Sequence, residues 1–292
     1  MEKKIIVTPI RALRDPCVLM ENGVYYVYGT GWVYYKNATG KLDGEWEGPF
    51  DACVVPEDCE AQQWAPEVHK YNGSYYMFTT FRSAKSGHRG CIVMKSDVPE
   101  GPFKMISDGF ITPSDWDSID ATFYVDEKGQ PWTVFVHEWT STDDKIGRFA
   151  AAKLSEDLTK IISEPVELFR ADAPAWAASG VTDGCWMYKT KGGQLLMLWS
   201  NFDKNGYCVA IARSESGNVY GPWVQDPDLL YGKVMKDKVN EYDGGHSMLF
   251  KTPSGQMYLS LHSPNNGACG RAETPVFIPV KEENETIVWD ED

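Results

Sequence analysis

The stretch ENGVYYVYGT, residues 21–30, carries the pattern of the whole chain: an Asn-Gly turn leads directly into an apolar run. Asn-Gly favours the tight turns that join antiparallel strands, and the run is rich in the aromatic and β-branched residues that strands prefer. The pattern returns four times, at the turn glycines Gly73, Gly129, Gly193 and Gly255. A repeat of roughly 50–65 residues is typical of a propeller or a related repeat architecture.

Further markers extend each unit to about four strands. The runs are apolar on both faces, so each sheet is expected to be covered on both sides, as propeller blades are. Gly-Pro-aromatic triplets at 48–50, 101–103 and 221–223 follow three of the hairpins, where an edge strand tolerates proline. We therefore predict an all-β fold, a five-bladed β-propeller with about four antiparallel strands per blade, forming one domain over residues 1–292. One end of the chain is expected to complete the last blade and close the ring.

The composition disfavours several kinds of partner. The net charge is −14, and no cluster of Lys and Arg interrupts the acidic composition, so we expect no binding to nucleic acid or to anionic membranes. No apolar run approaches the length of a membrane span. A neutral oligosaccharide of plant or microbial type suits such a chain better, and we expect a monomer or a weak oligomer.

The cysteines indicate a compartment. They number seven, an odd count, and they show no zinc-binding spacing. We interpret them as free, mostly buried thiols in a reducing environment, which predicts a cytoplasmic protein. A periplasmic or secreted location would follow if a signal had been removed from the N-terminus.

Reactive side chains stand at a similar place in four of the five repeats, eight to ten residues before the turn glycine. The five residues at this place are Asp15, Ala65, Asp120, Asp183 and His246. In a propeller the first strand of each blade lines the axis, so these residues are expected to face one mouth of the central channel. The second strands return to the same mouth and are expected to bring Trp32, Phe81, Glu138, Trp139 and Asn201.

Carboxylates that converge between aromatic walls suit the hydrolysis of a glycosidic bond. That reaction needs one carboxylic acid to protonate the leaving oxygen and one carboxylate to activate water. A third carboxylate raises the pKa of the acid by like-charge repulsion. Three aspartates on adjacent or next-adjacent blades can fill these three roles.

At these residues the chain resembles glycoside hydrolase family 43. The segments that carry the resemblance are RDPCVLMENGVYYVYGT (14–30), WAPEVHKYNGSYYMFTT (64–80), SIDATFYVDEKGQPW (118–132), VTDGCWMYKTKGGQLLMLWS (181–200) and GGHSMLF (244–250). The resemblance covers nearly the whole chain. It implies a five-bladed propeller and inverting hydrolysis of α-L-arabinofuranosyl, β-D-xylosyl or other furanosyl linkages, galactofuranosyl among them.

The resemblance also implies roles for single residues. Asp15 resembles the general base, Asp120 the carboxylate that tunes and orients the acid, and Asp183 the general acid. His246 resembles an axial histidine that in many members contacts calcium or another cation, often through water. Two further residues resemble parts of the substrate site: Trp64, an aromatic beside the reactive sugar, and Arg271, an arginine of the last blade. No organic cofactor is expected.

The chain departs from the family pattern at the acid, which is commonly Glu and here is Asp183. Its carboxyl is drawn back by one methylene, about 1.5 Å. Glu138, expected at the same mouth, is the rival acid. The alternative function is a catalytically impaired or non-catalytic propeller that binds glycans.

Other propeller enzymes fit the sequence less well. The fructan-cleaving family would need an N-D-P-N-G segment near the start, and sialidases would need an S-x-D-x-G-x-T-W repeat; neither is present. A phosphorylase would need a basic phosphate pocket, for which Arg82 and Arg271 are the only candidates.

Overall fold

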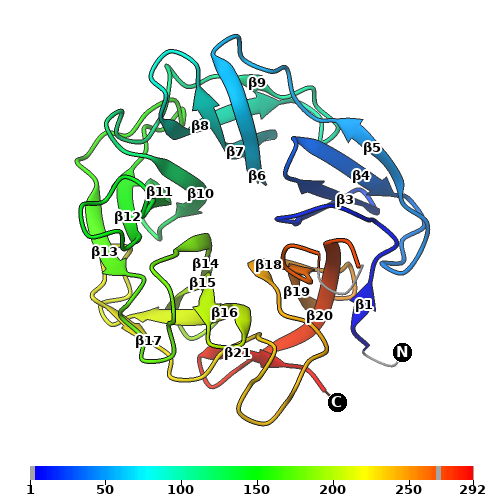
Figure 1. Cartoon of the computed structure of the whole chain (residues 1–292). Helices are drawn as coiled ribbons and strands as arrows, with labels where there is room; N and C mark the ends of the chain where they lie inside the picture. Colours follow the sequence, from blue (N-terminus) through cyan, green and yellow to red (C-terminus); the bar gives the residue numbers. More distant parts are fainter. Residues whose placement is uncertain (1–3, 268–270, 292) are drawn as a thin grey trace.

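The structure, a computed structural model, describes residues 4–267 and 271–291. Throughout these residues the regular elements are strands, arranged in five antiparallel sheets around a common axis (Figure 1). The predicted all-β, five-bladed propeller is therefore confirmed.

Each blade follows the chain from the axis outward. Blade 1 consists of β2 (Cys17–Glu21), β3 (Val24–Gly29), β4 (Val33–Asn37) and β5 (Glu47–Asp51). Blade 2 consists of β6 (Cys59–Tyr71), β7 (Ser74–Ser83), β8 (Arg89–Ser96) and β9 (Lys104–Met105). Blade 3 consists of β10 (Ser118–Val125), β11 (Pro131–His137), β12 (Arg148–Lys153) and β13 (Val166–Arg170). Blade 4 consists of β14 (Asp183–Lys189), β15 (Leu195–Asp203), β16 (Gly206–Ser214) and β17 (Trp223–Gln225).

The fifth blade joins the two ends of the chain. It consists of β18 (Gly245–Lys251), β19 (Met257–Ser263), β20 (Thr274–Glu283), β1 (Ile6–Val7) and β21 (Thr286–Trp289). Both β1 and β21 pair with β20, through Ile6 with Phe277 and through Val280 with Trp289. One terminal segment was expected to close the ring, and the structure uses both.

The Gly-Pro triplets mark the outer strands, as the sequence predicts. Gly48-Pro49 lies inside β5, while Gly101-Pro102 and Gly221-Pro222 come just before β9 and β17. These three peptide bonds are cis. The outer strands are short and lie at the rim of the ring (Figure 1).

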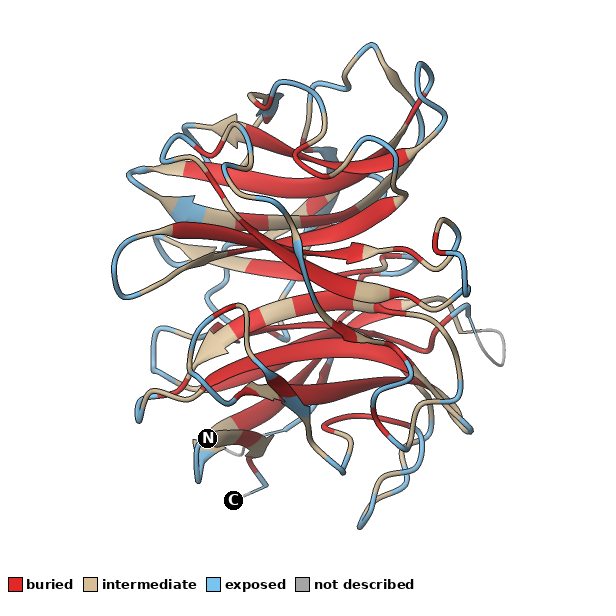
Figure 2. Ribbon diagram, turned by 90° about the vertical axis from the view of Figure 1, so that its left-hand side faces the viewer, coloured by how far each residue is buried: buried red, intermediate tan, exposed pale blue. Residues whose placement is uncertain are grey.

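Neighbouring blades bury each other's faces, which explains why the strands are apolar on both sides. Figure 2 shows the middle of most strands buried and most connecting turns exposed. Between blades 4 and 5, for example, Leu196, Leu198, Leu259 and Ile278 pack into one fully buried cluster. The first strands β6, β10, β14 and β18 lie nearest the axis (Figure 1), so residues at their starts share one end of the channel.

Candidate active site

The chain turns sharply where each blade begins. The residue at this turn has a left-handed backbone conformation in all five blades: Asp15 (φ 55°), Ala65 (φ 43°), Asp120 (φ 55°), Gly184 (φ 51°) and His246 (φ 53°). In blades 2 to 5 the pairing between the first two strands slips at the same point, as a β-bulge does. The repeated position in blade 4 is therefore Gly184. Asp183 stands one residue earlier, so the expected alignment of Asp183 with Asp15 and Asp120 was wrong by one step.

A belt of hydrogen bonds between blades holds these turns. The N–H of Ala65 donates to Thr30 Oγ1 (3.0 Å), and the N–H of Asp120 donates to Thr80 Oγ1 (3.1 Å). Each acceptor stands near the end of a second strand in the preceding blade. The two remaining bonds of this kind join His246 N–H to Ser200 Oγ (2.8 Å) and Asp15 N–H to His262 Nδ1 (3.2 Å).

Blade 3 does not supply the equivalent hydrogen bond to blade 4. Val136 pairs with Ile119 in the place that Thr80 and Ser200 hold in their own blades, and it has no hydroxyl. The Gly184 N–H turns instead to the Asp120 carboxylate, 2.9 Å from Oδ2. Asp120 is therefore fastened to the backbone beside Asp183.

The turns and the second-strand ends surround a cavity of about 290 Å³ at the axis. Its lining contains seven residues that the sequence predicted: Asp15, Trp64, Asp120, Glu138, Trp139, Asp183 and His246. It also contains four that the sequence analysis did not name as site residues: Arg14, Thr30, Ile119 and Tyr207. Arg14 adjoins Asp15 and could have been named with it, whereas Tyr207 carries no motif that marks it.

Asp15 lies among donors. Its Oδ2 accepts a hydrogen bond from Thr30 Oγ1 (2.5 Å), and its Oδ1 is 3.3 Å from His246 Nδ1. Burial alone would raise the pKa of this carboxyl, but His246, His262, Arg14 and the Thr30 hydrogen bond together outweigh burial and lower the pKa. Asp15 is consequently ionised at neutral pH.

His262 holds the backbone of Asp15. Burial lowers the pKa of this fully enclosed histidine to about 4, so the ring is neutral at neutral pH. Because Nδ1 accepts the Asp15 N–H, the ring proton belongs on Nε2, which is 3.3 Å from Asn265 Oδ1. This tautomer fixes the backbone of Asp15 without placing a charge behind it.

Asp120 has charged surroundings that are intermediate between those of Asp15 and those of Asp183. Burial raises its pKa and the charge of Asp15 adds to the rise, while His246, with Nδ1 3.7 Å from Oδ2, opposes it. The net pKa is above the ordinary value.

Asp183 has the opposite surroundings to Asp15. Burial raises its pKa well above the ordinary value, and the charges of Asp120 and Asp15 raise it further. The Tyr207 hydroxyl, 3.1 Å from Oδ2, opposes the rise only in part. Asp183 is thus the carboxyl of this cavity best suited to remain protonated.

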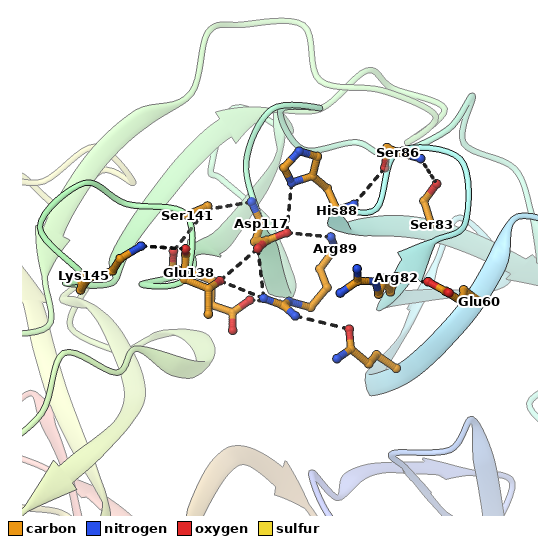
Figure 3. A network of polar contacts seen from close by, with 12 residues as sticks. Glu60, Arg82, Ser83, Ser86, His88, Arg89, Asp117, Glu138, Ser141 and Lys145 are labelled. Carbon is orange, nitrogen blue, oxygen red and sulfur yellow. Dashed lines mark hydrogen bonds and ion pairs between the residues drawn. The ribbon is translucent and has the colours of Figure 1, made fainter.

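Glu138 is held by a polar network at the edge of the cavity (Figure 3). Arg89 Nε donates to Glu138 Oε2 (2.6 Å), and Arg89 Nη2 donates to Asp117 Oδ2 (3.1 Å) and to Thr140 Oγ1 (2.8 Å). The Arg89 guanidinium also lies 5.9 Å from the ring centre of Trp64. Burial raises the pKa of Glu138, but the pairing with Arg89 opposes this rise, which makes Glu138 a weaker candidate acid than Asp183.

Four predicted substrate residues lie outside the cavity. Trp32 is 2% exposed and donates from Nε1 to Thr79 Oγ1 (2.6 Å), and Phe81 packs edge-to-face against it. Asn201 is fully buried and donates from Nδ2 to the Ala171 carbonyl (3.0 Å). Its amide therefore stabilises a loop and does not face a ligand.

Arg271 belongs to a different part of the surface. Its guanidinium lies 5.0 Å from the ring centre of Tyr242, and the residue lines a separate hollow beside β1. Arg14 supplies a guanidinium to the cavity in its place.

The predicted cation near His246 stays a prediction. The groups available to it are the His246 imidazole and the carboxylates of Asp15 and Asp120. Among residues 4–267 and 271–291, no group of three or more His, Cys, Asp and Glu side chains has an arrangement suited to a metal ion. Calcium prefers six to eight oxygen ligands, so a lone imidazole would contact it through water.

Six cysteines lie within the described residues, and all six are free thiols. Cys17, Cys91, Cys185 and Cys208 are buried, as expected for cysteines inside apolar strands. Cys269 lies outside the described residues.

Comparisons with known proteins point to one family of enzymes. A sequence profile described as "Glycosyl hydrolases family 43" matches residues 7–285. The chain is similar to the crystal structure of an endo-arabinase from Bacteroides thetaiotaomicron, with 35% identity and a TM-score of 0.83, over 98% of this chain and 100% of that one.

Curated relatives are more distant. The chain is 23% identical to "Extracellular endo-alpha-(1->5)-L-arabinanase 1" of Bacillus subtilis (strain 168), over 84% of this chain and 76% of that enzyme. It is 24% identical to "Extracellular exo-alpha-(1->5)-L-arabinofuranosidase ArbA" of Cellvibrio japonicus, over 53% of this chain, and the match spans only 47% of that enzyme's length.

The names of these two relatives bear on location. Both are called extracellular, so the prediction of a cytoplasmic protein finds no support. Within the part of the chain that the structure describes, no helix has the length and apolar character needed to cross a membrane.

Proposed function

Because the chain belongs to glycoside hydrolase family 43, as its motifs predicted, we propose that it hydrolyses α-L-arabinofuranosyl linkages in arabinan-type oligosaccharides with inversion at the anomeric carbon. The observation that carries the proposal is one cavity in which Asp15 has a lowered pKa and Asp183 a raised one. The endo-arabinase at 35% identity supports the choice of arabinose over other sugars.

Opposite pKa shifts assign the two chemical roles. Asp15 is ionised and accepts a proton from water as the water attacks the anomeric carbon. Asp183 is protonated and donates its proton to the glycosidic oxygen as the bond to carbon breaks. After one turnover Asp183 carries the charge and Asp15 the proton, and exchange with solvent restores both groups.

Asp120 acts through its neighbours. Its carboxylate accepts the Gly184 N–H and so fixes the backbone that follows Asp183, while its charge raises the pKa of the acid. The carboxylates of the cavity also favour the positive charge that develops on the sugar ring in the transition state.

The remaining lining suits a neutral sugar. Trp64 and Trp139 give the cavity apolar walls, and Glu138, held by Arg89, offers carboxylate oxygen to sugar hydroxyl groups. A cation near His246, if bound, would add positive charge beside Asp15 and Asp120.

The site of action follows from the relatives. We infer that the enzyme works outside the cytoplasm, where long arabinans are found, as the two relatives called extracellular do. Fractionation of the source cells with an antibody to the chain tests this, and a signal confined to the cytoplasm would contradict it.

The test of the activity is a substrate screen. Linear arabinan, arabino-oligosaccharides, xylo-oligosaccharides and the nitrophenyl glycosides of arabinofuranose, xylose and galactofuranose are each incubated with the wild type and with Asp15→Asn. We expect arabinose-containing substrates to be cleaved fastest, and proton NMR to show the β-anomer as the first product. Faster cleavage of xylosides would move the proposal to that sugar. Binding of arabino-oligosaccharides without any turnover would favour the non-catalytic alternative.

A further inference from the structure

Tyr207 contacts the proposed acid and is not itself assigned a role by any sequence motif. It is the second residue of β16, the third strand of blade 4, and its hydroxyl donates to Asp183 Oδ2 over 3.1 Å. Tyr207 is 1% exposed, while Asp183 is only partly buried. Asp183 therefore lies toward the open part of the cavity, and Tyr207 lies beneath it.

The ring of Tyr207 is held on several sides. It stacks on His262 (ring centres 5.6 Å apart, 27° between planes), and Phe202 lies 4.9 Å away. Its backbone N–H donates to Asp243 Oδ2 (3.0 Å). The ring also lies against Gly245, where a Cβ atom would come within 2.4 Å of Tyr207 Cε1, so glycine is required for this approach.

These contacts place Tyr207 between the two catalytic aspartates. Its hydroxyl reaches the acid, and its ring lies against the histidine that accepts the Asp15 N–H. One rigid side chain thus couples the position of Asp183 to the support of Asp15.

The hydroxyl also decides which oxygen of Asp183 carries the proton. Burial keeps the pKa of Tyr207 well above its ordinary value, so the phenol is a permanent donor. A protonated carboxyl has a single O–H, and the oxygen that accepts the Tyr207 hydrogen bond is the poorer place for it. The acidic proton is left on Oδ1.

We infer that Tyr207 is the positioning residue of the general acid: it fixes the Asp183 carboxyl by one oxygen and leaves the other, protonated oxygen to meet the glycosidic bond. The inference rests on the proposed function and deepens it. It also gives a reason why a short acid can serve here, since a carboxyl held in one orientation loses less to misalignment than a free one.

The test compares Tyr207→Phe with the wild type on two substrates, an arabino-oligosaccharide, whose sugar leaving group needs protonation, and dinitrophenyl arabinofuranoside, whose leaving group does not. We expect kcat on the oligosaccharide to fall by about 10- to 100-fold with KM nearly unchanged, and kcat on the dinitrophenyl glycoside to change by less than about threefold. The alkaline limb of the oligosaccharide pH profile should move to higher pH, because the carboxylate loses a donor that stabilises it.

Tyr28→Phe is the matched control. Tyr28 is a fully buried tyrosine of blade 1 whose hydroxyl donates to the Pro99 carbonyl, and it does not line the cavity. It reports the cost of losing one buried hydroxyl, and both activities should stay at the wild-type level.

Two results would overturn the inference: equal losses on both substrates, which indicate a merely structural tyrosine, or no loss on either. Should Tyr207→Phe fail to fold, a ring-fluorinated tyrosine at position 207 keeps the ring and strengthens the donor. The alkaline limb must then move to lower pH, and an unmoved limb contradicts the inference. A wild type inactive on both substrates would instead refute the proposed function.

Discussion

Asp15 and Asp183 are the same amino acid in one cavity, yet blades 1 and 4 give them opposite surroundings. Around Asp15 the cavity supplies the Thr30 hydroxyl, the His246 imidazole and the Arg14 guanidinium, which lower the pKa despite burial. Around Asp183 the largest effects are burial and two neighbouring carboxylates, which raise it.

The contrast shows that the role of a carboxylate is set by its neighbours. A base must be ionised and an acid protonated at the same pH, and two titratable groups with opposite shifts meet that requirement. The propeller provides it because the chain brings each aspartate to the axis near the start of an inner strand, where different residues surround each one: Thr30 contacts Asp15, and Tyr207 contacts Asp183.

The largest effect is expected from removing the base. Asp15→Asn keeps the side-chain shape and tolerates the left-handed backbone, but it cannot accept a proton from water. We expect kcat on arabino-oligosaccharides to fall by about 10⁴-fold with the fold intact by circular dichroism. Asp228→Asn, an exposed aspartate paired with Lys236, is the control. Loss of less than tenfold would remove Asp15 as the base.

The acid should show a smaller loss that depends on the leaving group. Asp183→Asn should lower kcat on arabino-oligosaccharides by about 10²- to 10³-fold, and by less than tenfold on dinitrophenyl arabinofuranoside, because only the sugar leaving group needs a proton. Asp183→Glu, which retains the acid, is the matched control and should keep measurable activity on both. If the two substrates lose activity in parallel, another group is the acid, and Glu138→Gln becomes the next variant to measure.

The pKa of Asp15 can be moved without touching its carboxyl. Arg14→Gln removes a cation that favours the carboxylate, so the pKa of Asp15 rises and the acidic limb of kcat/KM moves to higher pH by roughly one unit. Activity should fall by up to about tenfold at the most acidic pH values of this limb, and it should match the wild type near neutral pH. Arg11→Gln, an exposed arginine outside the cavity lining, should leave the profile unchanged. A uniform loss across the pH range would mean that Arg14 binds substrate and does not tune the base.

The smallest loss of activity is expected from restoring the inter-blade hydrogen bond that blade 3 lacks. Val136→Thr would offer a hydroxyl to the Gly184 N–H, as threonine and serine do for the equivalent N–H groups in other blades, and would release Asp120 from it. We expect kcat to fall by about two- to fivefold, since the acid loses part of its orientation. Val134→Thr, also fully buried in β11, controls for burying a hydroxyl. Equal kinetics of the two variants would show that the belt has no part in catalysis.

The blades and the three aspartates were predictable because their signals are local. Turn glycines, apolar runs and Gly-Pro triplets each mark one element, and the order of strands in a blade then follows from the short connections between them. The same reasoning placed Glu138 and Trp139 at the mouth, and the family resemblance placed Trp64 there; all three line the cavity.

The direction of single side chains was not predictable. Trp32 and Trp64 both stand where a strand meets the mouth, but Trp32 has a left-handed backbone (φ 54°) that turns its ring into the core against Phe81, while Trp64 faces the cavity. In β6 the pairing with β7 slips three times around Trp64, and each slip changes which residues face inward. The bulge at the start of blade 4 likewise could not be predicted, so the sequence did not reveal that Gly184, and not Asp183, holds the repeated position.

Tyr207 was missed for a different reason. Asp183 is two strands away in the same blade, and Gly245 and His262 meet Tyr207 only once blades 4 and 5 stand side by side. No spacing rule connects these residues, so only the assembled ring reveals the contact.

The pairing of β20 with both β1 and β21 has a consequence during synthesis. Asp15 is made early, yet its N–H acceptor, His262, lies 247 residues later, and the strand that binds β1 follows His262. A growing chain on the ribosome therefore carries the proposed base long before it can hold that residue in place. The enzyme should remain inactive until translation is nearly finished. Proteolytic removal of the last blade should abolish hydrolysis even though the remaining chain retains all three aspartates.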